Sequence, residues 1–215
     1  MAPVFRTLEG QAPYADTVEA MKAHAAAIRA GTAGEEVWFL EHHPVLTGGT
    51  SADIGDLVDP GDIPVHETGR GGQWTWHGPG QRVAYVMLDL QRRRPDVRAY
   101  VHDLESWIIG ALSHFGVKGV RREGLPGIWA PSPDATGQLD KVAAIGVRIS
   151  RWVTWHGIAV NLNPDMAGFE AIIPCGVRDG GVTSLRRLGV TADMAALDAA
   201  LHDSFGAIFP DPAED

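Results

Sequence analysis

One residue that could do chemistry is a single cysteine in a turn-like segment. Cys175 is the only cysteine in the chain, and it lies between a proline and a glycine in "IIPCGVRDGGVTSL", residues 172–185. A nucleophilic cysteine needs exposure, backbone N–H groups that stabilise an oxyanion, and a positive neighbour that favours the thiolate. A glycine-rich turn supplies the first two, so Cys175 is a candidate nucleophile. A lone cysteine also excludes an intramolecular disulfide and a cysteine-based zinc site.

Two further segments place polar side chains among glycines or apolar residues. "GRGGQWTWHGPGQ", residues 69–81, has glycine or proline at six of its thirteen positions and includes Arg70 and His77. Glycine lets a backbone approach a ligand closely, although a hairpin loop would have a similar composition. In "DKVAAIGVRIS", residues 140–150, Lys141 begins an apolar stretch that should be buried. A lysine at the edge of a buried strand usually extends to the surface, so its role depends on what it faces.

Four strings that occur in order make the chain resemble the lipoyl(octanoyl) transferase family, the octanoyl-carrier-protein:protein N-octanoyltransferases. They are "RGGQWTWHGPGQ", "KVAAIGVRI", "HGIAVNLN" and "IIPCGV…GVTSL". The resemblance runs from about Glu41, in "EHHPVLTGGTSA", to about Leu185. The first string is long and rare, so the signal is specific. The sequence departs from the family at Trp76, where tyrosine is more common, and therefore has no hydroxyl group at that position.

The resemblance implies an acyl transfer that needs no cofactor, metal or nucleotide. Such enzymes take an octanoyl group from acyl carrier protein, hold it as a thioester on a cysteine, here Cys175, and pass it to a lysine amine. This is the first step of endogenous protein lipoylation. The acceptors would be lipoyl domains of 2-oxoacid dehydrogenases and the glycine-cleavage H protein, and Lys141 would be the catalytic lysine. The residues implied to line the acyl site are Arg70, Gly71, Gly72, Gln73, Trp74, Thr75, Trp76, His77, Ala144, Ile145, Gly146, Gly157, Ile158 and Ala159.

One cysteine and one lysine can serve both halves of this reaction. A free thiol has a pKa near ~8.5 and is mostly protonated at neutral pH, and a nearby Lys141 ammonium would favour the thiolate. Acylation removes the negative charge of the thiolate, so a buried lysine can then release its proton and act as a general base toward the acceptor amine. Backbone N–H groups at residues 144–146 or Gly176 are candidate oxyanion donors. An apolar slot for six methylene groups would contribute roughly 5 kcal/mol to binding.

The residues alone leave three other functions open. His77 and His156, each followed by a glycine, could pair with Cys175 in a thiol hydrolase or protease. The chain could instead be a catalytically silent module that binds lipoyl domains or acyl carriers. It could also be an ATP-dependent lipoate ligase of the same fold, although we recognise no adenylate-binding signature and a nucleophilic cysteine would be superfluous there.

A mixture of helices and strands must position these segments. Helices are predicted over residues 14–31, 96–116 and 191–209, the third with Thr191 as its N-cap. Strands are predicted over residues 35–42, 81–90, 127–130, 141–150 and 152–162. The elements lack a steady strand–helix–strand rhythm, which favours an α/β or α+β single domain over residues 1–215, with a mixed sheet flanked by helices and a loose tail at 209–215. The resemblance implies the fold of lipoate and biotin protein ligase catalytic domains.

Charge and hydropathy exclude some partners and suggest others. The net charge of −9 argues against nucleic acid as the main partner. No apolar run approaches the ~18–20 residues of a membrane span, and the N-terminus lacks the apolar core of a signal peptide, so we expect a cytoplasmic monomer without a membrane partner. Arg148 and Arg151 are predicted to dock an acidic protein substrate beside the thioester site. Residues 92–94 are weaker docking candidates, because solvated charge is ordinary between a strand and a helix.

Overall fold

A mixed sheet of seven strands is the central element of the part of the chain that the computed structural model describes, residues 2–173 and 180–211. Across the sheet the strands are β1 (Val4–Ala12), β2 (Glu36–His42), β6 (Gln81–Met87), β10 (Val153–Asn161), β9 (Leu139–Ser150), β8 (Leu125–Pro131) and β7 (Val120–Arg122). β1 pairs with β2 in parallel, and the other neighbours are antiparallel. The predicted fold class, a mixed sheet flanked by helices, is confirmed.

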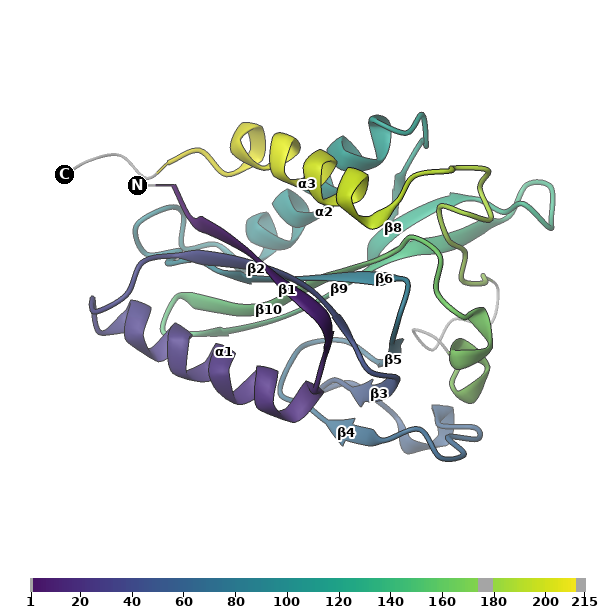
Figure 1. Ribbon diagram of the computed structural model, residues 1–215, viewed down its shortest axis with the longest axis horizontal. Coiled ribbons are helices and arrows are strands. Elements are labelled where there is room, and N and C mark those ends of the chain that lie inside the picture. The colour runs from purple at the N-terminus through teal and green to yellow at the C-terminus, as the bar shows by residue number, and fades with distance from the viewer. Residues whose placement is uncertain (1, 174–179, 212–215) are drawn as a thin grey trace.

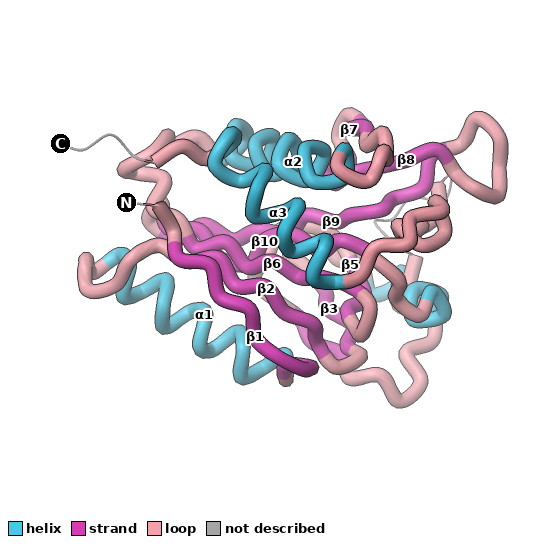
Figure 2. Tube along the Cα trace, turned by 45° about the horizontal axis from the view of Figure 1, so that its top comes forward, coloured by secondary structure: helices cyan, strands magenta, loops and turns pink. Residues whose placement is uncertain are grey.

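Helices cover both faces of this sheet (Figure 1; Figure 2). α1 (Tyr14–Arg29) packs on one face, and α2 (Val97–Ser113) and α3 (Met194–Ile208) pack together on the other. Successive side chains of β6 alternate between the two cores, so Val83 packs with α1 and Ala84 packs with α2 and α3. Among the helices of the described ranges, none has the length and apolar character needed to cross a membrane.

A smaller sheet lies on the same side of the large sheet as α1 (Figure 1). Its strands are β3 (Val45–Gly48), β4 (Val65–Glu67) and β5 (Trp74–His77), in the order β4-β3-β5. Two short 3₁₀ turns, η1 (Ile54–Asp56) and η2 (Met166–Ala171), lie in the segments around it. The sequence pattern predicted neither this sheet nor β1, because the strands are short, glycine-rich or exposed and show no clear alternation.

Helix ends agree with their sequence signals, with one exception. Gly31 and Gly116 follow α1 and α2 with φ angles of 71° and 70°, in the left-handed region that favours glycine. The prediction that Thr191 is the N-cap of α3 is wrong. Asp193 is the N-cap, and its carboxylate accepts a hydrogen bond of 2.8 Å from the backbone N–H of Ala196. Both residue types are good N-caps, so composition could not separate them.

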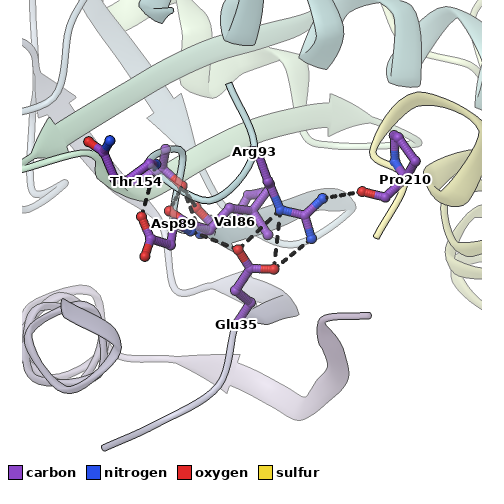
Figure 3. Close-up of polar contacts among 8 residues, drawn as sticks. Glu35, Val86, Asp89, Arg93, Thr154 and Pro210 are labelled. Carbon is purple, nitrogen blue, oxygen red and sulfur yellow. Dashed lines mark hydrogen bonds and ion pairs between the residues drawn. The ribbon is translucent and has the colours of Figure 1, made fainter. Parts of the chain in front are cut away.

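A buried ion pair ties the start of β2 to the C-terminal part of the chain (Figure 3). Arg93 Nη2 donates to Glu35 Oε2 at 2.6 Å, and Arg93 Nη1 donates to the carbonyl oxygen of Pro210 at 2.6 Å. Arg93 is therefore a structural residue, which removes it from the weaker docking candidates at residues 92–94. Phe209, the first residue of the predicted loose tail, is buried against the aromatic core. Residues 212–215 of the predicted tail lie outside the described residues.

Candidate active site

A cavity of about 390 Å³ lies between the large sheet and the segment that leads into β5. The predicted segments, far apart in the sequence, meet in its walls. Residues 70–75 and His77 come from the segment before and within β5, residues 144–146 and Lys141 from β9, and residues 157–159 from β10. Within the described ranges, the structure thus brings together every predicted acyl-site residue except Trp76.

Small residues on two paired strands form the floor of the cavity. Ala144 of β9 pairs with Ala159 of β10, and Gly146 pairs with Gly157. Directly opposed residues of neighbouring strands lie on the same face of a sheet, so these pairs keep that face free of bulky side chains. A Cβ atom at Gly146 would lie only 2.9 Å from Cδ of Arg70. The loop above can therefore approach the sheet only because residue 146 has no side chain.

Arg70 holds the loop that forms the opposite wall. Its side chain is buried, and Nη2 donates to the carbonyl oxygen and the hydroxyl of Thr47 at 2.7 and 2.9 Å. The same guanidinium donates to the carbonyl oxygens of Gly71 and Gln73 at 2.9 and 3.1 Å. The backbone N–H of Gly71 donates to the carbonyl oxygen of Val147 at 2.9 Å, which ties the loop to β9. Arg70 therefore shapes the cavity wall, a role that the sequence did not indicate.

Trp76 faces away from the cavity. Its ring packs against Phe169 in the core of the smaller sheet, with the ring centroids 5.4 Å apart. A Cβ atom at Gly78 or Gly168 would lie 2.2 or 2.4 Å from the indole, so these glycines make room for it. Because side chains alternate along a strand, Trp76 lies on the face of β5 opposite to His77. This corrects the expectation that Trp76 lines the acyl site.

Lys141 is buried at the cavity wall rather than extended to the surface. Only 7% of the residue is exposed, and Nζ donates to the carbonyl oxygen of Pro126 at 2.9 Å. Nζ also lies 4.9 Å from the ring centroid of Trp129. Gly127, with a φ angle of 120°, has no side chain to crowd the lysine, since a Cβ there would lie 3.3 Å from Nζ. The lysine thus carries its amine into the cavity in a defined position.

Cys175 lies outside the described residues, but the chain that follows it is placed beside Lys141. The backbone N–H of Lys141 donates to the carbonyl oxygen of Gly181, and the N–H of Thr183 donates to that of Lys141, both at 2.9 Å. Val182 accordingly forms a parallel bridge with Lys141. The segment that contains the predicted nucleophile is therefore joined in sequence to the strand partner of the predicted catalytic lysine.

The two histidines of the cavity wall are uncharged at neutral pH. Burial lowers the pKa of His77 and that of His156 to about 3, aided by the neighbouring His42 at His77 and by the guanidinium of Arg70 at His156. A neutral imidazole adds no positive charge beside a thiolate, and a base with so low a pKa removes protons poorly near pH 7. The charge state thus disfavours the thiol-hydrolase interpretation. In the described part of the chain, no group of three or more histidine, cysteine, aspartate or glutamate residues could hold a metal ion.

Three further residues of the cavity wall carry no clear signal in the sequence. Val83 and Tyr85 of β6 line the cavity, as does Tyr14 at the start of α1. The hydroxyl of Tyr85 lies 2.7 Å from Nε2 of His42, and both side chains are buried. The alternation of "QRVAYVM" could have indicated that Val83 and Tyr85 share a face, whereas nothing in the sequence indicates which face of the strand the cavity occupies.

The two predicted docking arginines lie at different distances from Lys141. Arg151 and Trp152 form the turn between β9 and β10, with φ angles of 51° and 66°. At ~3.3 Å per residue, Arg151 is roughly 33 Å along the strand from Lys141. Arg148 is closer, and its guanidinium stacks 5.3 Å from the ring centroid of Trp155. Arg148 directly follows Val147 of the cavity wall, so it is the better placed of the two docking candidates.

Comparison with known sequences gives extensive matches. The family model for the lipoyl protein ligase A/B catalytic domain matches residues 13–206. A protein of Cereibacter sphaeroides named octanoyltransferase is 56% identical over 210 residues, which cover 95% of this chain and 96% of that protein. A Rhodopseudomonas palustris protein of the same name is 58% identical over 204 residues, 94% of this chain and 80% of that protein.

Solved structures share the fold at low sequence identity. A bipartite lipoate protein ligase from Thermoplasma acidophilum superposes with a TM-score of 0.73 and 16% identity, over 100% of this chain and 87% of that one. A lipoate-protein ligase A bound with ATP gives a TM-score of 0.71 and 16% identity, over 100% and 89% of the two chains. The expected likeness to the lipoate ligase fold is confirmed.

Proposed function

The chain belongs to the lipoyl protein ligase A/B catalytic domain family and, within it, to the octanoyltransferases, and from this premise we propose how it acts as an acyltransferase. It takes an octanoyl group from the thioester of an acyl carrier protein and holds it as a thioester on Cys175. It then passes the group to a lysine amine of a lipoyl domain, in 2-oxoacid dehydrogenases or the glycine-cleavage H protein.

The observation that carries this proposal is a buried amine at the wall of a cavity that can take an acyl chain. Nζ of Lys141 is held by the carbonyl oxygen of Pro126, and the ring of Trp129 lies beside it. The floor next to it consists of the small pairs described above, Ala144 with Ala159 among them. An alkyl chain can lie over such a floor, and its burial contributes about 0.8 kcal/mol per methylene group.

In the first half-reaction, the Cys175 thiolate attacks the carbonyl carbon of the donor thioester. A new carbon–sulfur bond forms to Cys175, and the bond to the donor sulfur breaks. The ammonium group of Lys141 favours the attacking thiolate and then gives its proton to the departing donor thiolate. Because one thioester replaces another, the energy of the bond is kept and no nucleotide is consumed.

In the second half-reaction, the acceptor amine attacks the carbonyl carbon of the acyl-enzyme. The acceptor lysine arrives as an ammonium group and loses two protons, one to the neutral amine of Lys141 and one to solvent. An amide bond forms, the bond to the sulfur of Cys175 breaks, and the thiolate is restored. Both groups end in the state in which they began, so the cycle closes.

Product analysis without ATP separates this function from its alternatives. The protein is incubated with octanoyl-acyl carrier protein, with and without a lipoyl domain. Octanoylation of the domain supports the proposal. Release of free octanoate would indicate a hydrolase instead, and transfer that occurs only from free octanoate with ATP would indicate a ligase. An unchanged donor under both conditions, together with no transfer from free octanoate and ATP, would leave a binding module as the explanation.

A further inference from the structure

A series of hydrogen-bonded, buried side-chain amides connects His77 in the cavity wall to Thr183, the neighbour of Val182, which forms a bridge with Lys141. Nδ1 of His77 lies 2.6 Å from Oε1 of Gln81. Nε2 of Gln81 donates to Oδ1 of Asn161 at 3.0 Å, and Nδ2 of Asn161 donates to the carbonyl oxygen of Thr183 at 2.9 Å. Gln81, Asn161 and Thr183 are all at least 96% buried, so water does not compete for these bonds.

Two backbone carbonyl groups determine the direction of every hydrogen bond in this series of side-chain amides. The carbonyl oxygens of Trp76 and Thr183 can only accept, so Nε2 of Gln81 must face the first, at 3.1 Å, and Nδ2 of Asn161 the second. The oxygen of Asn161 therefore accepts from Gln81. Both hydrogens of Nε2 of Gln81 are then donated, one to Trp76 and one to Asn161. Oε1 of Gln81 must therefore accept its hydrogen bond from Nδ1 of His77. A neutral His77 consequently carries its proton on Nδ1 and has an acceptor at Nε2.

The other end of the chain of amides holds the backbone at Lys141. The carbonyl oxygen of Thr183 accepts a hydrogen bond from the side chain of Asn161. The backbone N–H of Thr183 donates to the carbonyl oxygen of Lys141 at 2.9 Å. Asn161 also accepts at its backbone oxygen from the N–H of Leu185, at 2.8 Å. The segment around Thr183 is thus fixed between β10 and β9, and the backbone position of Lys141 depends on it.

We propose that Gln81 and Asn161 are positioning residues for acyl transfer: their amides fix the tautomer of His77 in the cavity wall and hold the Thr183 segment against Lys141. This inference rests on the proposed transferase function. Neither side chain lines the cavity, so both act through other residues. Their loss should lower kcat more than it raises KM, because a displaced lysine amine affects the reacting geometry and leaves the acyl slot intact.

Kinetics with a small octanoyl thioester as donor tests the Lys141 end. Asn161→Asp keeps the size and the acceptor for Gln81 but, when ionised, has no donor for Thr183. We expect kcat to fall about 10–100-fold, with KM changed less than about twofold. Asn163→Asp, the same change at an exposed position two residues away, is the control and should match the wild type. Equal rates in the two variants, or a change confined to KM, would overturn the proposal.

Nitrogen-15 NMR of the histidine rings tests the His77 end and needs no activity. The His77 signals are identified by their loss in His77→Phe. We expect Nδ1 to be protonated in the wild type and in Gln81→Glu, which keeps an acceptor, and the proton to move to Nε2 in Gln81→Leu. Gln91→Leu, at an exposed position, should behave as wild type. A wild-type His77 protonated on Nε2 would overturn the proposal even if transfer is normal, whereas absent transfer with the expected tautomer would contradict only the proposed function.

Discussion

The amine of Lys141 and the ring of Trp129 form a buried cation–π contact, with Nζ 4.9 Å from the ring centroid. The guanidinium carbon of Arg122 lies 4.6 Å from the same centroid. Trp129 is itself 1% exposed and donates from Nε1 to the carbonyl oxygen of Leu125 at 3.4 Å. The ring is therefore fixed by the core, and it can hold the lysine at a set position in the wall.

Removal of the aromatic ring should slow both half-reactions. Trp129→Leu loses the contact with the ammonium group, which is worth about 0.5–2 kcal/mol in desolvated sites. We expect each single-turnover rate to fall about tenfold, a change that corresponds to roughly 1.4 kcal/mol, while Trp129→Phe should keep most of the activity. Rapid-quench measurement of acylation and of transfer checks this.

The control is Trp107→Leu, which removes an equally buried indole from the core between α2 and α3. It should lower the free energy of unfolding by a few kcal/mol, as large-to-small core substitutions do, and leave both rates of the folded enzyme unchanged. Equal rate losses in the two variants would mean that Trp129 acts through stability alone.

Replacement of Lys141 should separate its two roles. Lys141→Ala should slow acylation and transfer alike, because both the charge and the base are lost. Lys141→Arg keeps a positive charge but cannot release a proton near neutral pH, so transfer should suffer at least tenfold more than acylation. Single-turnover rates of the two half-reactions measure the difference, and equal losses in the arginine variant would argue against a general base at this position.

Reversal of charge at Arg148 should weaken the use of protein-borne substrate. Arg148→Glu should raise KM for octanoyl-acyl carrier protein about fivefold, as expected when an exposed arginine loses a charge pair worth about 1 kcal/mol. The effect should shrink as salt rises. A small octanoyl thioester should react as before. Arg151→Glu at the β9–β10 turn is the matched control, and equal effects of the two reversals would sink the docking prediction for Arg148.

Stability should fall as the solution is acidified below pH 6.5. The pKa of His77 is about 3 in the fold against 6.5 for the free side chain, so the unfolded chain binds more protons between these values. The contribution of His77 to the free energy of unfolding is fully present above pH 6.5 and is lost as the pH falls toward 3. One such histidine accounts for about 2 kcal/mol between pH 8 and pH 5.

Urea unfolding at pH 5 and pH 8 measures this dependence. His77→Gln should reduce the difference between the two pH values by about that amount. His102→Gln, at an exposed position on α2, should leave it unchanged. Equal stability of the wild type at both pH values would contradict a buried, neutral His77.

The parts of the fold that the sequence predicted are those with a strong local pattern. α2 follows from an apolar face that repeats at helical spacing, and β9 and β10 follow from apolar runs bounded by turn residues. The smaller sheet could not be predicted, because its strands are three or four residues long and depend on pairing with segments far away. The prediction that the side chain of Trp76 lines the acyl site was wrong for the same reason, because the face on which Trp76 lies depends on the register of β5.

The site was predicted as segments but not as a network. Glycine-rich strings indicated stretches of chain that the structure brings together in the cavity wall. The structural roles of Arg70, Gln81 and Asn161 were not predicted, because a buried amide or guanidinium acquires its role from partners that only the folded chain supplies. Arg70 and Arg93 illustrate this, since each binds backbone carbonyl groups that no pattern identifies.

The central claim is that the octanoyl group is held on Cys175 between donor and acceptor. Because the chain has one cysteine, intact-mass analysis after mixing with octanoyl-acyl carrier protein reports on this directly. The account predicts one octanoyl adduct on the wild-type enzyme, released by hydroxylamine and discharged onto an added lipoyl domain, and no adduct on Cys175→Ala. An adduct that persists on Cys175→Ala, or octanoylation of the lipoyl domain by that variant at the wild-type rate, would contradict it.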